Sequence, residues 1–368
     1  MKKTGHIYAK AGVDYSKMDP VKVLAQKKAA QTAKNLKKLG MNEIVASRGE
    51  SAYVWEEPDS YRSLVIEGLG TKNLIADDMR KITGKTYYDQ IAQDAVAMIV
   101  NDLIVVGAMP QVVNAYFAIG ESDWMTDKKR AKDLVNGWAA ACNTIGATWG
   151  GGETPTLKGV IEPATIDIGG AATGIIQPKS RLVLGEKLAD GDAIVLIESS
   201  GIHANGITLV RKMTESLPNG YGTKISTNKM LGDVLLTPTH LYVSLVRDLL
   251  MANLDIHYMV NVTGHGWRKL MRATKPFTYE FTTVPKPQPE FDFIRETLGI
   301  SDQEMYASFN MGAGFAIYLP KSQAAQVVSV AKQNKLRAWV CGQVKKGPKK
   351  VVIKPKDITY KADTMEVR

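Results

Sequence analysis

The chain has 368 residues, of which 45% are apolar and 23% charged, and its formal net charge is +10. This composition is typical of a globular protein and excludes a disordered or fibrous chain, while the length suits two domains of ordinary size. Two cysteines, Cys142 and Cys341, are too few for a disulfide framework or a zinc site. No apolar stretch is long enough for a secretion signal or a membrane span. We therefore expect a cytoplasmic protein with no membrane partner.

Most of the excess positive charge lies near the C-terminal end. Residues 321–368 contain ten lysines and two arginines against three carboxylates. The centre of this segment, residues 344–356, is predicted to form a hairpin followed by a solvated tail. Clustered lysines usually form a solvated face or an edge strand, and no aromatic side chains are interleaved with them for base stacking. Nucleic acid is therefore a disfavoured partner, although a basic binding protein acting through residues 345–361 stays open as a hypothesis.

The N-terminal half is predicted to alternate helices and strands. Residues 20–39 are rich in Lys, Ala, Gln and Leu and favour an amphipathic helix that ends at Gly40. A strand at 63–66 leads into a glycine-rich loop at 67–72. We expect further helices at 87–106 and 126–146, and strands at 112–119 and 163–176, the last interrupted by Gly169 and Gly170. Gly107 and Pro110 end the helix before them, because glycine favours helix C-termini and proline cannot continue a helix.

The alternation of predicted strands and helices stops and begins again around residues 178–181. We place a boundary there between an N-terminal domain of residues 1–177 and a C-terminal domain of residues 178–368. Beyond it we expect a buried strand at 193–197, helices at 203–213 and 242–253, a strand at 315–319 and a helix at 323–333. Mixed strands and helices in both halves indicate two α/β or α+β domains.

The common nucleotide and hydrolase signatures are absent. Gly84-Lys85-Thr86 resembles the end of a P-loop, but the position of its leading glycine is Met79, so the phosphate cradle cannot form. The Gly-x-Gly pairs at 68–70 and 312–314 lack the third glycine of a dinucleotide fingerprint. The five histidines are scattered, and no Gly-x-Ser-x-Gly elbow is present. These patterns exclude a Walker ATPase, a zinc protease of the HExxH type and an α/β-hydrolase.

Three polar loops remain as candidates for chemistry. Residues 67–72 combine a carboxylate, two glycines and a lysine, and residues 150–154 combine three glycines with Glu153. Residues 199–206 follow a buried strand and precede a helix, where free N–H groups favour anions. The glycines of each loop could instead serve only to make a tight turn, and that alternative stays open.

The helix predicted at 87–106 buries polar residues in an apolar run. At about 100° per residue, Asp94 and Asn101 lie within roughly 20° of each other, and Asp102 lies some 80° round. Asp94 and Asp102 are about 12 Å apart along the axis, so one metal ion cannot be held by both. Asp94 could share a cation with Glu67, while Asp102 braces the turn or serves a second site; alternatively Asn101 and Asp102 only cap backbone groups. Because a buried carboxylate is costly without a partner, we expect a polar group against each.

Eight motifs, taken in order, resemble those of the aminoimidazole ribonucleotide synthetase (phosphoribosylformylglycinamidine cyclo-ligase) family. The resemblance runs over most of the chain, and any one motif alone would be weak. Its segments are Tyr8–Asp14 (Y-x-x-A-G-V-D), Glu67–Lys72 (D-G-V-G-T-K), Asp102–Pro110 (D-x4-G-A-x-P), Gly151–Thr154 (G-G-E-T), Ser199–Gly206 (S-S-G-x-H-S-N-G), Leu236–Thr239 (L-x-P-T), Thr263–Gly266 (T-G-G-G) and Met305–Gly314 (M-Y-x-x-F-N-M-G-x-G).

The resemblance implies a two-domain architecture with an N-terminal ATP-binding domain and a homodimer formed through the N-terminal sheets. It also implies ATP and Mg²⁺ as cofactors, bound without a P-loop. In the family, ATP activates the formamide oxygen of formylglycinamidine ribonucleotide, and an amidine nitrogen then closes the imidazole ring. The implied substrate is thus a small ribonucleotide phosphate, and Mg²⁺ and a lysine neutralise charge on the transferring phosphoryl group.

The resemblance also implies roles for individual residues. The expected catalytic residues are Lys72, Asp94 and His203. The expected ATP-binding residues are Gly68, Gly70, Thr71, Lys72, Asn101, Gly151 and Gly152. The expected substrate-binding residues are Ser199, Ser200, Gly201, His203, Asn205 and Gly206. The expected metal ligands are Glu67, Asp94 and Asp102.

The chain departs from the family pattern at three places. Glu67 replaces an aspartate, and Pro155–Lys158 replaces A-E-M-P. Residues 264–272 replace G-G-G and E-N-x-P-R, which removes a carboxylate and a proline and adds bulk and positive charge. The motifs expected at the ATP site thus match the family pattern better than those expected at the substrate site. We therefore keep two enzyme hypotheses: the cyclo-ligase, and a paralogous ATP-dependent kinase or ligase that acts on another small substrate.

Overall fold

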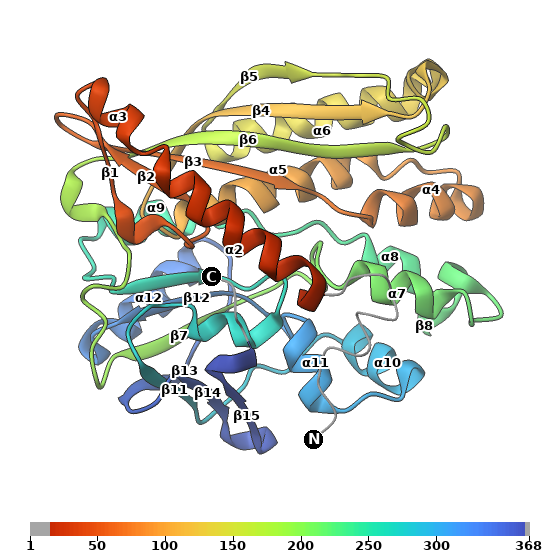
Figure 1. The fold of residues 1–368 in the computed structure, drawn as a ribbon. Helices are drawn as coiled ribbons and strands as arrows, with labels where there is room; N and C mark the ends of the chain where they lie inside the picture. Colours follow the sequence, from red (N-terminus) through yellow and green to blue (C-terminus); the bar gives the residue numbers. More distant parts are fainter. Residues whose placement is uncertain (1–14, 365–368) are drawn as a thin grey trace.

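Two β-sheets organise the chain (Figure 1). The computed structural model describes residues 15–364, so the motif at Tyr8–Asp14 lies outside the described residues. Six strands within residues 42–176 form one sheet, and seven strands within residues 193–361 form the other. The mixed α/β architecture expected from the sequence is confirmed. The proposed domain boundary at 177 and 178 falls in the connection between the two sheets.

The N-terminal sheet has the strand order β1-β2-β3-β6-β4-β5 and is antiparallel except for the pair β4 and β5. The helices α5 and α6 pack on one of its faces, and Figure 1 shows them behind the strands. The strands are β1 (Asn42–Glu43), β2 (Tyr53–Glu56), β3 (Tyr61–Gly68), β4 (Met109–Ile119), β5 (Thr148–Glu153) and β6 (Ile166–Ile176). The helices are α2 (Tyr15–Gln31), α3 (Lys34–Lys38), α4 (Lys72–Thr83), α5 (Tyr88–Ile104) and α6 (Lys128–Ile145).

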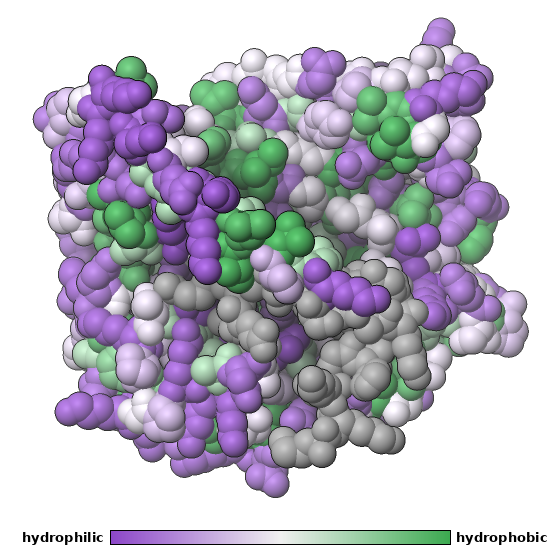
Figure 2. Space-filling view, in the orientation of Figure 1, coloured by the Kyte–Doolittle hydropathy of each residue, from purple (hydrophilic) through white to green (hydrophobic). Residues whose placement is uncertain are grey.

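The other face of this sheet is open and partly apolar. Along β3, Ser63 and Val65 are buried toward the helices, whereas Leu64 and Ile66 point outward, as strand alternation requires. Ile66 is 80% exposed, and Val112 and Tyr116 of β4 are exposed as well. Figure 2 shows hydrophobic residues among polar ones over this layer, in the upper half of the view. The sheet therefore has one face in the core and one apolar face outside it.

Two local predictions in this half are wrong. The strand β6 runs without interruption through Gly169 and Gly170, because these glycines serve close packing: a Cβ at Gly170 would lie 2.2 Å from the carbonyl oxygen of Asn114. The helix expected at 20–39 is divided into α2 and α3 by a turn at residues 32 and 33.

The C-terminal sheet has the order β10-β12-β7-β13-β11-β14-β15 and is antiparallel except for the pair β11 and β14. Its strands are β7 (Ala193–Glu198), β10 (Tyr258–Asn261), β11 (Phe277–Phe281), β12 (Ala313–Leu319), β13 (Ala338–Lys346), β14 (Lys350–Ile353) and β15 (Ile358–Lys361). The hairpin predicted at 344–356 is wrong, because β11 lies between β13 and β14. The residues after β14 form the last strand rather than a solvated tail.

The helices of this half are α7 (Ile207–Thr214), α8 (Leu231–Leu235), α9 (Val243–Met251), α10 (Pro289–Leu298), α11 (Asp302–Ser308) and α12 (Ala324–Gln333), and a small pair, β8 (Lys224–Ser226) and β9 (Lys229–Met230), lies between α7 and α8. The helix expected from residue 203 begins only at Ile207, so residues 203–206 stay in the preceding loop. Among the described helices, none combines the length and the hydropathy of a membrane span.

The Gly-Ala-x-Pro sequence after α5 marks a close backbone crossing. Gly107 has φ +84°, a left-handed conformation, and a Cβ there would lie 2.0 Å from the carbonyl oxygen of Arg181. The amide of Val183 donates to the carbonyl of Val106 at 3.1 Å. The segment that leaves the N-terminal sheet therefore passes directly over the end of α5, and only glycine fits beneath it.

Candidate active site

Polar residues of α5 hold a loop of the C-terminal half. Asp94 Oδ1 accepts hydrogen bonds from the amide (2.8 Å) and hydroxyl (2.5 Å) of Thr239. Asn101 Oδ1 accepts from the amide of Tyr242 at 3.0 Å, and its Nδ2 donates to the carbonyl of His240 at 2.8 Å. The expectation that polar groups meet these side chains is confirmed. Asn101, predicted to bind the nucleotide, is engaged instead with backbone.

Lys72 and Asp94 form a buried ion pair next to this loop. Lys72 Nζ lies 2.7 Å from Asp94 Oδ2, both side chains are fully buried, and Nζ also donates to the carbonyl of Thr237 at 3.0 Å. Burial lowers the pKa of Lys72, and the charge of Asp94 opposes that shift. Both Asp94 oxygens thus face protein donors, and these contacts, rather than a cation shared with Glu67, are what the structure shows for Asp94. Lys72, predicted at the ATP phosphates, is enclosed at the contact between the two halves.

Asp102, rather than Asp94, is the carboxylate whose charge acts on Glu67. Asp102 Oδ1 accepts from Asn261 Nδ2 at 2.8 Å and lies 3.8 Å from Lys269 Nζ. Burial first, and then the charge of Asp102, raise the pKa of Glu67 to about 7, while Lys269 acts in the opposite direction. Of the three predicted metal ligands, Glu67 and Asp102 thus act on each other electrostatically, whereas Asp94 pairs with Lys72.

The segment that departs from the family pattern supplies the positive charge at this place. Lys269, in the short helix Gly266–Met271, donates from Nζ to Thr263 Oγ1 at 2.6 Å. Arg272 donates to the carbonyl of Gly49 and lies 3.7 Å from Glu50. The sequence shows the added positive charge in residues 264–272, but Lys269 and Arg272 were not predicted as site residues. That added charge was the signal that could have identified them.

Glu67 and Asp102 have the chemistry of a partial magnesium site. Within residues 15–364, no group of three or more His, Cys, Asp or Glu side chains could hold a metal. Mg²⁺ usually takes one or two protein carboxylates, with substrate phosphates and waters as its remaining ligands. Two carboxylates whose charges interact therefore fit Mg²⁺ that is bound together with a nucleotide, whereas Asp94 is already paired with Lys72.

The glycine-rich loop lies at the contact between the two halves. The strand β3 ends at Gly68 and α4 begins at Lys72. Gly70 has φ +76°, and no atom lies within 4 Å of the position of a Cβ there. Thr71 Oγ1 is 3.4 Å from Thr208 Oγ1 in the first turn of α7. The loop thus faces the residues that follow the Ser199–Gly206 loop.

The Ser199–Gly206 loop is held from inside the protein. Ser199 Oγ donates to Asn310 Oδ1 at 2.9 Å, and Asn310 Nδ2 donates to the carbonyl of Gly201 at 2.8 Å. His203 Nε2 accepts from the amide of Ser200 at 3.1 Å, and burial lowers the pKa of His203 well below its usual range. His203, predicted to be catalytic, is therefore a buried neutral acceptor that fixes the loop. Asn310 belongs to the motif Met305–Gly314 but was not predicted as a site residue.

The accessible end of this loop is at Asn205 and Gly206, which are half-buried. Gly206 has φ +81°, and a Cβ there would lie 2.3 Å from the ring of Phe309. Asn205 Nδ2 contacts the sulfur of Met98, on α5, at 3.6 Å. Asn205 and Gly206 therefore lie at the contact between the two halves, near the glycine-rich loop.

Gly151 and Gly152 do not belong to this group. They are exposed on β5, at the edge of the sheet, where a Cβ at Gly152 would lie 2.0 Å from the carbonyl of Ala115. The register places Gly68, Gly169, Tyr116 and Glu153 in one row across four strands. At about 4.8 Å per strand, β5 lies roughly 14 Å from β3. The structure thus separates the third predicted polar loop from the other two.

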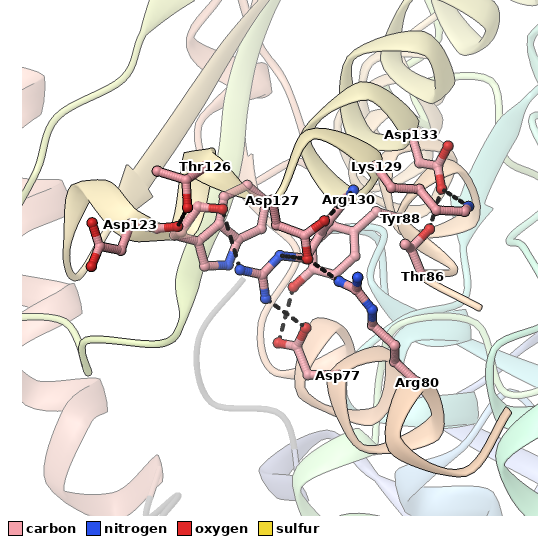
Figure 3. A network of polar contacts seen from close by, with 11 residues as sticks. Asp77, Arg80, Thr86, Tyr88, Asp123, Thr126, Asp127, Lys129, Arg130 and Asp133 are labelled. Atoms are coloured by element: carbon pink, nitrogen blue, oxygen red, sulfur yellow. Dashed lines mark hydrogen bonds and ion pairs between the residues drawn. The ribbon is translucent and has the colours of Figure 1, made fainter. Parts of the chain in front are cut away.

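A second charged network joins α4 to α6 (Figure 3). Arg130 Nη1 donates to Asp77 at 3.3 Å, and its guanidinium lies 4.2 Å from the centre of the Trp124 ring. Arg80 pairs with Asp127, the residue that caps α6. A cavity of about 640 Å³ lies beside the network. Since these acidic and basic groups neutralise one another, the network stabilises the packing of α4 on α6.

Glu67 is expected to make the protein less stable as the pH rises. Its pKa of about 7 in the folded protein is above the ordinary value of 4.5, so its contribution is complete below pH 4.5 and is lost as the pH rises through 7. The free energy of unfolding, measured by urea denaturation, should fall between about pH 5 and pH 7.5, and should fall less in Glu67→Gln. The same fall in both proteins would contradict this assignment.

Comparison with known proteins decides the family. Residues 49–176 match the description "AIR synthase related protein, N-terminal domain", and residues 189–354 match "AIR synthase related protein, C-terminal domain". The phosphoribosylformylglycinamidine cyclo-ligase of Methanosarcina barkeri is 34% identical over 326 residues, which cover 88% of this chain and 91% of the relative. The chain belongs to the phosphoribosylformylglycinamidine cyclo-ligase family.

Solved structures of more distant proteins share the fold of this cyclo-ligase family member. A chain of the HypE–HypF complex is 18% identical, with a TM-score of 0.61 over 85% of this chain and 93% of that chain. The hydrogenase maturation protein HypE in complex with ATP is 21% identical, with a TM-score of 0.54 over 72% and 75% of the two chains. At these identities the likeness is one of fold alone.

Proposed function

We propose that this protein is an ATP-dependent cyclo-ligase that converts formylglycinamidine ribonucleotide to aminoimidazole ribonucleotide in purine biosynthesis, in the cytoplasm. The observation that supports this most is the 34% identity to a cyclo-ligase over 91% of that relative's length. The paralogue hypothesis is not favoured, because the two HypE structures are only 18% and 21% identical.

The accessible loops suit this chemistry. An amide oxygen is a poor leaving group, and the phosphoryl group of ATP makes it a good one. The exposed backbone of Gly68 and Gly70 and the N-terminus of α4 offer N–H groups of the kind that bind phosphates. HypE, which shares this fold, has been solved with ATP. We therefore place the nucleotide phosphates at the Gly68–Thr71 loop.

Glu67 and Asp102 would hold Mg²⁺ next to these phosphates, where the ion would neutralise developing negative charge. Asn261 fixes the orientation of the Asp102 carboxylate through its hydrogen bond. On the other side, the buried bonds of His203 and Asn310 hold the Ser199 loop in one shape. That rigid loop would present Asn205 to the substrate.

The direct test is to incubate the purified full chain with formylglycinamidine ribonucleotide, ATP and Mg²⁺. Formation of both ADP and aminoimidazole ribonucleotide is expected, and Asp102→Asn should lower the rate of both together. A protein whose melting temperature rises with ATP but shows no further rise with the purine intermediate, and no product, would instead be a paralogue with another substrate.

We also propose that the enzyme is a homodimer that pairs through the open face of the N-terminal sheet. Leu64 and Ile66 of β3 and Val112 and Tyr116 of β4 are exposed on this face, with Ile66 at 80%. A contiguous apolar face of this kind on a protein surface usually marks an interface. A second copy is the partner that the family resemblance implies.

Ile66→Glu is expected to convert this dimer into a monomer, because each copy would bury a carboxylate in the apolar interface. Light scattering coupled to size-exclusion chromatography measures the mass directly. Met251→Glu is the matched control, since Met251 is 64% exposed on α9 of the other half and should leave the dimer intact. A wild-type monomer, or an unchanged mass for Ile66→Glu, would contradict the proposed interface.

A further inference from the structure

We propose that Lys269 is an internal counter-cation for the carboxylates Glu67 and Asp102 and competes with a divalent cation for them. The proposal rests on the proposed function in one respect, which is that Mg²⁺ is expected at this pair. It concerns a lysine that the family pattern does not supply, in the segment where this chain exchanges a carboxylate for positive charge.

The geometry places the ammonium group at the pair. The side chain of Lys269 is 9% exposed and that of Asp102 is 7% exposed, and Nζ lies 3.8 Å from Oδ1. Thr263 Oγ1 accepts from Nζ at 2.6 Å and so fixes its position. Lys269 comes from the C-terminal half, whereas the two carboxylates come from β3 and α5 of the N-terminal half.

Asp102 is buried and Glu67 is half-buried, and the charge of Asp102 acts on Glu67. Two carboxylates in such surroundings require a positive charge near them. The other groups that face this place do not provide it as directly. Arg272 is hydrogen-bonded to Gly49 and lies 3.7 Å from Glu50, a third carboxylate. His265 is held neutral, since burial first and the nearby cations next lower its pKa to about 3. Arg272 also lowers the pKa of Glu67, but Lys269 acts on it more strongly and is the cation in contact with Asp102.

An ammonium group and a divalent ion cannot both be close to the same two carboxylates, because their charges repel. At a separation of about 4 Å this repulsion stays large even at the effective dielectric constant found near a protein surface. Lys269 must therefore weaken the binding of a divalent ion at Glu67 and Asp102, or move away when the ion binds. Either response makes the metal affinity of this chain depend on Lys269.

The test uses Mn²⁺ as a paramagnetic probe, added to the full-length protein without nucleotide and followed by electron paramagnetic resonance. Lys269→Met is expected to bind Mn²⁺ at least about tenfold more tightly than the wild type. Lys275→Met is the matched control: it removes the same charge from an exposed lysine that is bonded only to backbone carbonyls, and should bind like the wild type.

Two further variants keep the result interpretable. Lys269→Gln retains a donor for Thr263, and should show the same gain if Lys269→Met fails to fold. Adding Asp102→Asn to either variant should remove the gain. An Mn²⁺ affinity equal to that of the wild type in a folded Lys269→Gln protein would overturn the proposal. A clear gain in a protein that makes no aminoimidazole ribonucleotide would overturn the proposed function and leave the counter-cation in place.

Discussion

Replacing Lys72 with methionine is expected to lower the free energy of unfolding by about 3–5 kcal/mol, because it leaves Asp94 as an uncompensated buried charge. The two groups lie 2.7 Å apart and neither side chain is exposed. The variant also removes the hydrogen bond from Lys72 to the carbonyl of Thr237. Urea denaturation followed by circular dichroism measures the loss.

Lys81→Met is the matched control on the same helix. Lys81 is 76% exposed and pairs with Asp78, a contact of the kind that contributes about 1 kcal/mol or less. Asp94→Asn added to Lys72→Met should restore part of the lost stability, because no buried charge then remains. If Lys72→Met and Lys81→Met lowered the free energy of unfolding by equal amounts, the buried Lys72–Asp94 pair would contribute no more than an exposed pair, which would contradict the prediction.

Gly107→Ala is expected to cost about 2–5 kcal/mol. A left-handed backbone conformation costs an L-residue roughly 1–2 kcal/mol, and forcing a methyl group into a packed position costs about 1–3 kcal/mol more. Gly107 meets both conditions, with φ +84° and the carbonyl of Arg181 2.0 Å from the new Cβ. Chemical denaturation should show the loss.

Gly84→Ala separates the two contributions. Gly84 ends α4 at φ +75°, but no atom lies within 4 Å of the position of its Cβ. Only the backbone cost of about 1–2 kcal/mol is expected there. A loss at Gly107 no larger than that at Gly84 would show that the segment at Arg181 can move aside.

The spacing of apolar residues predicted individual helices and strands well, because each of these elements depends mainly on residues that are close in sequence. The spacing of apolar residues in α5 and the apolar run of β7 depend on neighbours in sequence, and both elements lie close to the predicted ranges. The hairpin prediction failed because pairing is not local. The strand β11, some sixty residues before β13, lies between β13 and β14, and no turn signal near residue 347 could reveal it.

The difference between local and long-range contacts also explains how much of the candidate site could be predicted. Helix geometry correctly separated Asp94 from Asp102, but it could not say which loop packs on which face. Asp94 meets Thr239, 145 positions away, and Asp102 meets Asn261, 159 positions away. The charge that acts on Glu67 is therefore that of Asp102, whereas the prediction paired Glu67 with Asp94. The motifs identified the loops at 67–72 and 199–206, whereas the role of Lys269 required the packing of the two halves.

The short peptide from Thr237 to Thr239 connects the two candidate loops. Lys72, at the start of α4, donates to the carbonyl of Thr237, while Ser200 Oγ donates to the carbonyl of Pro238 at 2.6 Å. Asp94 holds Thr239 from a third direction. The glycine-rich loop, through Lys72, and the Ser199 loop, through Ser200, are thus hydrogen-bonded to the same short peptide. Their separation is set when the chain folds, so a ligand spanning both must match a fixed length.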